Sequence, residues 1–300
     1  MLPLIGSEID QPYETAEVVI LPVPYEMTTT YRKGCQRGPE ALLAASDQLE
    51  YYDVELQREI CFGVGIHTYH PIPLQGRCAI ANSQETPHLT PEKMVKEVET
   101  TVSQLLADNK FIITLGGEHS ITAGVVAAYQ QDSPEPFTVV QIDAHGDLRD
   151  NYEGSKYNHA CVMRRVVEQG IPTLAVGLRS LCQEEAEFIE SHSLPVVWGE
   201  ETANNPDWIE AGLTQINTPN IFITIDLDGL DPSICAGVGT PQPGGLSWYQ
   251  TTRFLRRLFE TYRVLGCDVM ELSPLGDSVV SEFTAAKLVY KLIGYHTLNP

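Results

Sequence analysis

The sequence predicts a three-layer α/β/α sandwich on a mainly parallel sheet of about eight strands. Short apolar runs rich in β-branched residues recur along the chain, and each is continuously apolar rather than alternating. Such runs indicate strands that are covered on both faces. Between them lie segments with apolar residues at helical spacing, so regular strand–helix alternation implies right-handed crossovers between parallel strands. Periodicity alone does not distinguish this sandwich from a closed barrel.

The elements can be placed in order along the chain. The helix that starts at Thr90 has the clearest signals, because Thr-Pro forms an N-cap and first turn and Met94, Val98 and Val102 repeat at helical spacing. Strands are expected at 18–23, 60–66, 111–115, 137–142, 173–178, 194–198, 221–225 and 264–270. Further helices are expected at 38–50, 120–130, 160–169, 182–191, 206–216, 247–261 and 281–293. Long loops, which often border a site, are expected at 25–37, 67–89 and 229–246.

Composition excludes some classes of function. With 19 Lys and Arg against 40 Asp and Glu, the formal charge is −21, which argues against binding nucleic acid or an anionic membrane through a basic face. Seven scattered cysteines without a CxxC pair fit a reduced compartment. Neither a signal peptide nor an apolar run of about 18 residues is visible. We therefore expect a cytoplasmic protein with one domain over residues 1–300.

Polar residues cluster at the ends of four of the expected strands. The motifs are GGEHS at 116–120, DAHGD at 143–147, DLDGLDP at 226–232 and ELSP at 271–274. Ligands of an open α/β sheet bind beyond the carboxyl ends of its strands, so parallel strands would bring the four clusters to one edge. A short acidic turn is common by itself, and it is the coordination of four clusters that indicates a site.

The residue types in these clusters indicate a metal site. Asp143, His145 and Asp147 alternate with a period of two, as do Asp226 and Asp228, so each set leaves an extended segment on one side. So many carboxylates repel one another unless positive charge lies among them. Two metal ions that share carboxylates would supply that charge and activate a water for hydrolysis. Oxygen and imidazole ligands without thiolate favour Mn²⁺, with Ni²⁺, Co²⁺ or Fe²⁺ as alternatives, over a structural zinc site.

Several motifs, in this order, resemble those of the ureohydrolases, the family of arginase and agmatinase. They are GGEHS, DAHGDLRD, the histidine of YNHACVMRR, TIDLDGLDPS, GTPQPGGLSW and DVMELSP, and the resemblance runs from about residue 17 to about residue 293. It implies a three-layer α/β/α protein with a mainly parallel eight-stranded sheet and a binuclear manganese centre. It also implies assembly into homo-trimers or homo-hexamers.

Carried over by motif position, the resemblance implies a ligand set for each of two metal ions. One ion would be bound by His119, Asp143, Asp147 and Asp226. The other would be bound by His145, Asp143, Asp226 and Asp228. Asp143 and Asp226 would therefore bridge the pair.

The resemblance also implies three catalytic residues. Asp147 would carry a proton to the departing amine, and Glu271 would hold the nitrogens of the guanidino group. His159 would act as the proton shuttle. Many relatives have His-Gly-Thr where this chain has His159-Ala160-Cys161, so the loop around the shuttle departs from the family pattern.

The implied reaction is hydrolysis of a small cationic guanidino compound to urea and an amine. Arginase-like relatives hold the amino-acid end of arginine partly with an acid in a GLRDVD-type loop, where this chain has GLRSLC at 177–182. The absent acid predicts agmatine as the substrate, with putrescine and urea as products of a step in polyamine biosynthesis. The alternative substrates are 4-guanidinobutyrate, arginine and free guanidine, the last in a nickel-dependent relative.

Two functions of other kinds compete with this prediction. One is a different hydrolysis on the same fold, such as deacetylation at a single zinc ion. The other is a non-catalytic paralogue that binds metal, which the presence of all six ligand positions and Glu271 argues against. Outside the ligand set, Asp268 is expected to be a buried hydrogen-bonding residue and Asp231 to form a turn.

Overall fold

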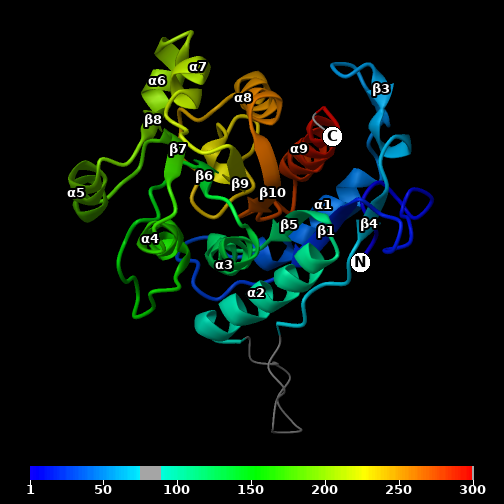
Figure 1. Cartoon of the computed structure of the whole chain (residues 1–300), viewed down its shortest axis with the longest axis horizontal. Helices are drawn as coiled ribbons and strands as arrows, with labels where there is room; N and C mark the ends of the chain where they lie inside the picture. The colour runs from blue at the N-terminus through cyan, green and yellow to red at the C-terminus, as the bar shows by residue number, and fades with distance from the viewer. Residues whose placement is uncertain (75–88, 299–300) are drawn as a thin grey trace, which may run out of the picture.

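Eight parallel strands form the central sheet of the protein. The computed structural model describes residues 1–74 and 89–298, so most of the loop expected at 67–89 lies outside the described residues. The strands are β1 (Val18–Val23), β4 (Ile66–Thr68), β5 (Phe111–Gly116), β6 (Phe137–Ile142), β7 (Thr173–Leu178), β8 (Val196–Trp198), β9 (Asn220–Asp226) and β10 (Arg263–Met270). Their order is β4-β1-β5-β10-β9-β6-β7-β8, and every neighbouring pair is parallel (Figure 1). The predicted eight-stranded sheet is confirmed.

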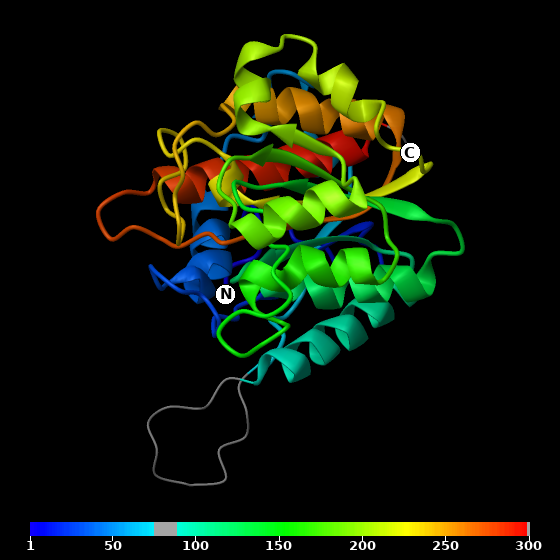
Figure 2. The ribbon, with the colours of Figure 1, turned by 90° about the vertical axis from the view of Figure 1, so that its left-hand side faces the viewer.

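Helices cover both faces of the sheet and complete the three layers (Figure 2). One layer contains α2 (Pro91–Ala107), α3 (Thr122–Asp132), α4 (Val162–Glu168) and α5 (Gln183–His192). The other contains α1 (Gly38–Ser46), α7 (Trp208–Leu213), α8 (Trp248–Thr261) and α9 (Val280–His296), and the short α6 (Gly199–Asn204) leads from β8 into α7. Among the described residues, no helix is long and apolar enough to cross a bilayer.

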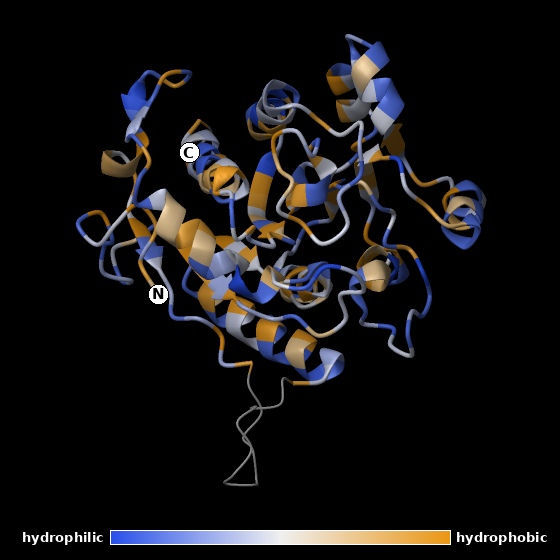
Figure 3. Ribbon diagram, turned by 180° about the vertical axis from the view of Figure 1, so that it is seen from behind, coloured by the Kyte–Doolittle hydropathy of each residue, from blue (hydrophilic) through white to orange (hydrophobic). Residues whose placement is uncertain are grey.

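Apolar side chains on the two faces of the sheet belong to two separate hydrophobic clusters. In β1, Val18 and Ile20 pack into the cluster on the α8 and α9 side, whereas Val19 and Leu21 pack into the cluster on the α2 and α3 side. Because successive strand residues point to opposite faces, a strand covered on both sides must be apolar at every position. The covering helices need only one apolar stripe, and α2 accordingly carries alternating orange and blue residues in Figure 3.

The strand expected at 60–66 is wrong in its position. Residues Ile60–Phe62 form a 3₁₀ turn, closed by a hydrogen bond from the N–H of Gly63 to the carbonyl of Ile60 at 2.9 Å, and β4 begins only at Ile66. Ile60 and Cys61 are apolar because they are buried in the hydrophobic cluster that includes α9. A short apolar run does not distinguish a strand from a buried turn. The helix expected at 206–216 is likewise shorter, Trp208–Leu213, and α6 was not predicted.

Candidate active site

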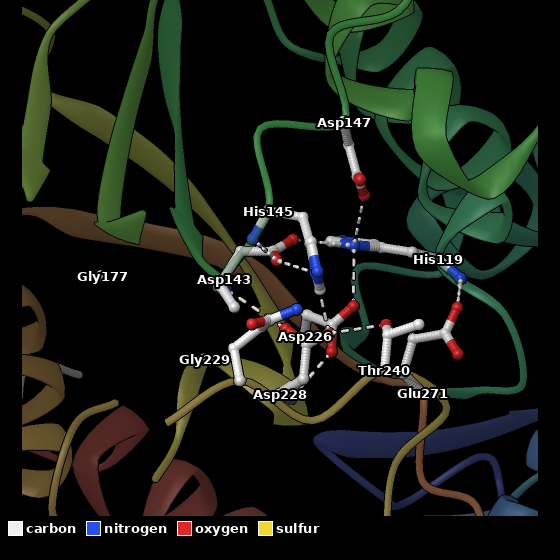
Figure 4. Close-up of polar contacts among 12 residues, drawn as sticks. His119, Asp143, His145, Asp147, Gly177, Asp226, Asp228, Gly229, Thr240 and Glu271 are labelled. Carbon is white, nitrogen blue, oxygen red and sulfur yellow. Dashed lines mark hydrogen bonds and ion pairs between the residues drawn. The ribbon is translucent and has the colours of Figure 1, made fainter. Parts of the chain in front are cut away.

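The four predicted polar clusters lie together at the carboxyl edge of the sheet. They follow β5, β10, β9 and β6, which are neighbours in the sheet. Asp226 is the last residue of β9 and pairs with Met270 of β10, while Asp143 directly follows β6. The 3₁₀ turn after β5 begins at His119. Figure 4 shows the side chains of His119, Asp143, His145 and Asp226 directed into one space.

His119 is surrounded by three carboxylates. Its Nδ1 atom lies 3.2 Å from Asp143 Oδ2, 3.2 Å from Asp147 Oδ2 and 3.3 Å from Asp226 Oδ2. The other ring nitrogen, Nε2, lies 2.8 Å from the hydroxyl of Thr224. A proton on Nε2 donates to Thr224 and leaves the lone pair of Nδ1 directed at the carboxylates. Histidines that bind metals are commonly oriented by such a second hydrogen bond.

Nδ1 of His119 has close neighbours but no directed hydrogen bond. The atom is buried, and none of the nearby carboxylate oxygens meets it in hydrogen-bond geometry. Burial lowers the pKa of His119, but the carboxylates of Asp143, Asp147 and Asp226 outweigh burial and raise it well above its usual value. A position where three oxygens and one nitrogen stabilise a positive charge is suited to a metal cation, which competes with the proton for the same lone pair.

His145 forms a second group on the other side of Asp143. Its Nδ1 atom lies 2.9 Å from Asp228 Oδ2 and 3.8 Å from Asp143 Oδ1. Burial lowers the pKa of His145, but the hydrogen bond with Asp228 raises it to about 10. Although burial acts in the opposite direction, the same bond lowers the pKa of Asp228, which also accepts the backbone N–H of Ala144 at 3.2 Å.

The negative charge of the cluster exceeds the positive charge of the nearby side chains. The four aspartates of the cluster are at most 6% exposed. Burial, together with Asp147 and Asp228, raises the pKa of Asp143 to about 7, and burial with Asp228 raises that of Asp226 well above its usual value. In the part of the chain that the structure describes, no lysine or arginine forms an ion pair with these aspartates. Carboxylate and imidazole donors without thiolate therefore fit divalent metal ions.

Two groups of donor atoms overlap at Asp143. Asp143 forms one group with His119 and Asp147, and the other with His145 and Asp228. Within each group the ligand atoms lie within 4.8 Å of one another. Asp143 belongs to both groups, so its carboxylate is able to bridge two ions. Asp226 lies between the groups, because Oδ2 faces His119 and Oδ1 accepts the N–H of Asp228 at 2.8 Å. All six residues predicted as ligands are thus brought together: His119, Asp143, His145, Asp147, Asp226 and Asp228.

The carboxylate of Glu271 contacts the backbone of His119. The backbone of Glu271 has a positive φ of 67°, and its N–H donates to the carbonyl of Gly117 at 2.8 Å. One carboxylate oxygen, Oε1, accepts the backbone N–H of His119 at 2.8 Å. Burial and the nearby Asp226 raise the pKa of Glu271 well above its usual value. A positively charged ligand beside this carboxylate would favour its ionised form.

His159 lies at the same space but makes few polar contacts through its ring. Nδ1 is 4.0 Å from Glu271 Oε1, and Nε2 is buried without a hydrogen-bond partner. Burial lowers the pKa of His159, because the buried ring disfavours the charged form. The backbone N–H donates to the hydroxyl of Thr28 at 2.9 Å. In the 3₁₀ turn His159–Cys161, which departs from the family pattern, the side chain of Asn158 caps the N–H of Ala160.

A cavity of about 230 Å³ opens onto the cluster. Asp147, His159 and Glu271 line it, and its walls include Arg149 and Ser180. A larger groove, of about 680 Å³, lies at the opposite edge of the sheet, where β5 and β10 begin, and is lined by none of the predicted site residues.

Sequence reasoning placed one supporting residue correctly and missed others. Asp268 is fully buried and accepts a hydrogen bond from the hydroxyl of Thr122 at 2.9 Å, as expected for a buried hydrogen-bonding residue. Thr224 was missed, although it lies two residues before Asp226 in β9 and therefore on the same face. Thr28 was also missed, and its distance of 131 residues from His159 left no local signal.

The fold and the cluster together define the class: an α/β/α protein with a buried centre of histidines and aspartates at the carboxyl edge of a parallel sheet. The model of the arginase family matches residues 16–294, and the chain belongs to this family. The protein is therefore a hydrolase of the ureohydrolase type.

Named relatives cover nearly the whole chain. A protein of Synechocystis sp. named N(1)-aminopropylagmatine ureohydrolase is 54% identical over 97% of this chain and 92% of its own. The solved structure of the agmatine ureohydrolase of Thermoplasma volcanium has a TM-score of 0.82 and 30% identity, and the match covers 99% of this chain and 95% of that one. Proclavaminate amidino hydrolase from Streptomyces clavuligerus, at 20% identity, has the same fold, with a TM-score of 0.87 and coverage of 100% and 98%.

Proposed function

We propose that the protein hydrolyses a linear guanidino amine of the agmatine type to urea and an amine. The observation that carries the proposal is the cavity in which Glu271 and the His/Asp cluster meet. Ser180, Leu181 and Cys182 of the cavity wall are not acids, at the place where an arginase-like protein would hold the amino-acid head of arginine. The neighbouring acid, Glu185, is already engaged by two backbone N–H groups. A substrate without that head leaves no buried polar group unpaired there.

Two guanidino amines are the leading substrates. Agmatine is the substrate predicted from the sequence, and its products would be putrescine and urea. The Synechocystis relative carries the name of N(1)-aminopropylagmatine, which is agmatine lengthened by an aminopropyl group. Because this relative is 54% identical, we favour the longer amine as the preferred substrate and agmatine as the shorter alternative.

Six residues are proposed to hold two metal ions. His119, Asp143, Asp147 and Asp226 would hold one ion, and His145, Asp143, Asp226 and Asp228 would hold the other. When bound, divalent ions supply the Lewis acidity that lets a water act as a nucleophile near neutral pH. The excess negative charge of the four aspartates supports this assignment, because it is costly to bury without cations.

Three residues are proposed to bind the substrate and to transfer protons during its hydrolysis. Oε1 of Glu271 is occupied by the N–H of His119, which leaves Oε2 to accept hydrogen bonds from the guanidinium nitrogens. Asp147 lines the cavity and carries a proton from the attacking water to the departing amine. The departing amine needs a second proton, and His159, whose Nε2 is unpartnered, passes it between solvent and the site.

The remaining assignments rest on the resemblance to the family. We propose Mn²⁺ as the ion, with Ni²⁺ or Co²⁺ as substitutes, and a single domain over residues 1–300. We also propose a cytoplasmic homo-trimer or homo-hexamer, which sedimentation of the purified protein would test. No nucleic acid or membrane is needed by this function.

A urea-release screen tests the proposal. The protein is stripped of metal, reloaded with Mn²⁺ or Ni²⁺, and assayed with N(1)-aminopropylagmatine, agmatine, 4-guanidinobutyrate, arginine and guanidine. We expect the highest kcat/KM for N(1)-aminopropylagmatine with Mn²⁺, a lower value for agmatine, and no urea from arginine. Urea from none of the five would refute the proposed substrate class, and arginine as the best substrate would refute the argument from Ser180.

One observation favours a second candidate. Arg149 lines the cavity, where a guanidinium attracts an anionic tail such as the carboxylate of 4-guanidinobutyrate. Its guanidinium carbon lies 4.7 Å from the centroid of the Tyr152 ring, which holds it by a cation–π contact. A higher kcat/KM for 4-guanidinobutyrate than for either amine would favour this candidate.

A further inference from the structure

The loop that carries Asp147 has an unusual backbone. Asp147 has a φ of 53°, in the left-handed region that residues with a Cβ rarely adopt. Its carbonyl accepts two backbone N–H groups at the start of α4, from Met163 at 3.0 Å and from Arg164 at 3.2 Å. A conformation of this kind persists only where surrounding contacts fix it on both sides of the residue. The contacts on the other side of Asp147 therefore matter for its side chain.

Glu185 makes the contact on that other side. Its Oε1 accepts the backbone N–H of Leu148, the residue that follows Asp147, at 3.0 Å. Its Oε2 accepts the N–H of Cys182 at 2.9 Å, in the capping box at the start of α5. The side chain is 4% exposed, so each oxygen of one buried carboxylate holds one backbone N–H.

The rest of the loop is docked on the same segment. The carbonyl of Ala144 accepts the N–H groups of Arg179 at 2.9 Å and Ser180 at 3.0 Å. Gly146 packs so closely that a Cβ built there would lie 2.5 Å from Leu181 Cδ2 and 3.2 Å from Glu185 Oε1. Residues 144–148 are therefore fixed against 179–185, with Glu185 as the contact nearest to Asp147.

We propose that Glu185 is a positioning residue that sets the place of the Asp147 carboxylate in the metal centre. The inference rests on the proposed metal site and deepens it, because Glu185 acts through the loop rather than as a ligand. Two N–H donors require two acceptor oxygens, and a glutamine has only one. Its amide NH₂ would face one of the two N–H groups, so the variant would lose either the contact to Leu148 on the loop or the cap at Cys182.

Glu184 provides a matched control. It precedes Glu185 in α5, carries the same charge at the same helix end, and accepts the N–H of Asp150 at 3.2 Å, but its side chain is exposed. Glu184→Gln therefore changes the charge and the dipole interaction of α5 without touching the contact to Leu148. A difference between Glu185→Gln and Glu184→Gln therefore reports the two buried hydrogen bonds of Glu185 rather than the charge at this helix end.

The experiment measures Mn²⁺ binding to the metal-free protein by calorimetry, together with kcat and KM. For Glu185→Gln we expect the affinity of one Mn²⁺ site to fall roughly 10–100-fold, the range for residues that orient metal ligands, with a lower kcat and an unchanged KM. Glu184→Gln should match the parent protein. If Glu185→Gln does not fold, Gly146→Ala, which pushes the same loop away from Leu181 and keeps the Glu185 carboxylate, should give the same loss of affinity.

The outcomes separate the two proposals. A parent protein that binds no Mn²⁺ would contradict the proposed metal site itself. Two Mn²⁺ sites of parental affinity in both loop variants would overturn the role of Glu185. A raised KM with unchanged kcat and metal affinity would also overturn it, since that result indicates direct contact of Glu185 with the substrate.

Discussion

His119 and Thr224 are joined by a hydrogen bond of 2.8 Å between Nε2 and the threonine hydroxyl. Both side chains are fully buried, so the bond is shielded from water. Because Nε2 is engaged, Nδ1 is the nitrogen that faces Asp143, Asp147 and Asp226. The hydrogen bond to Thr224 therefore leaves Nδ1, rather than Nε2, as the ring nitrogen that can bind a cation.

Replacing this hydroxyl should weaken metal binding. In Thr224→Val the ring loses its hydrogen-bond partner while the side-chain shape is kept, and we expect Mn²⁺ affinity to fall roughly 10–100-fold. Thr114→Val is the control, because Thr114 is an equally buried strand threonine whose hydroxyl has no hydrogen-bond partner. Equilibrium binding of Mn²⁺ measures both, and equal affinities in the two variants would contradict the orienting role.

Asp147 should be essential for turnover beyond its part in metal binding. Asp147→Asn keeps an oxygen ligand but does not accept a proton, so we expect kcat to fall roughly 10²–10⁴-fold with Mn²⁺ at saturating concentration. Asp150→Asn, three residues away, should stay within about twofold, since Asp150 is partly exposed and pairs with Lys156 and Arg165 rather than with the metal centre. Full turnover by Asp147→Asn would exclude it as the proton carrier.

His159 should limit proton exchange rather than metal binding. For His159→Asn we expect kcat to fall roughly 10²-fold, with unchanged Mn²⁺ affinity and partial recovery when free imidazole is added. Recovery would identify the missing group as a mobile proton acceptor. His70→Asn, at an exposed histidine, is the control and should behave like the parent protein. A loss of Mn²⁺ affinity in His159→Asn would instead mark it as part of the metal centre.

The central sheet and the ligand set could be predicted because their signals are local. A strand buried on both faces is apolar at every position, and residues at its carboxyl end share an edge with those of its neighbours. Asp143 and Asp226, 83 positions apart in the sequence, are therefore expected at the same edge of the sheet without any knowledge of the loops. The prediction that four clusters converge needed only the direction of the strands.

The supporting contacts could not be predicted because they join segments with no sequence relation. Glu185 reaches Leu148 across 37 residues, and Glu118 accepts hydrogen bonds from the N–H groups of Met27 and Thr28 across about 90. Each of these acids is an ordinary polar residue beside a helix start when seen alone. Their roles depend on how loops pack at one end of the sheet, which strand periodicity does not encode.

Lys291 and Asp53 form a buried ion pair far from the cavity. Nζ of Lys291, on α9, lies 2.8 Å from Asp53 Oδ1 and 2.6 Å from Glu55 Oε2, and so ties α9 to the small hairpin of β2 (Tyr52–Asp53) and β3 (Arg58–Glu59). Lys291 is 6% and Asp53 is 1% exposed. Burial opposes ionisation of Asp53, but the hydrogen bond from Lys291 outweighs it and holds the pKa of Asp53 below its usual value.

Removing Lys291 should therefore destabilise the fold in a pH-dependent way. Lys291→Met leaves a buried carboxylate without its partner, and we expect a loss of roughly 3–5 kcal/mol near pH 7. Because the folded-state pKa of Asp53 is lowered, the stabilisation is present above its unfolded-state pKa near 3.8 and disappears as the pH falls through the lowered value. Urea unfolding at pH 7 and pH 3 should show a smaller difference in unfolding free energy between parent and variant at the lower pH.

Lys287→Met is the control. Lys287 lies one helical turn earlier and is only partly buried, so its loss should lower the unfolding free energy by less than about 1 kcal/mol at either pH. A difference that stays constant between the two pH values would mean that lost packing of the lysine stem, rather than the ion pair, accounts for the effect.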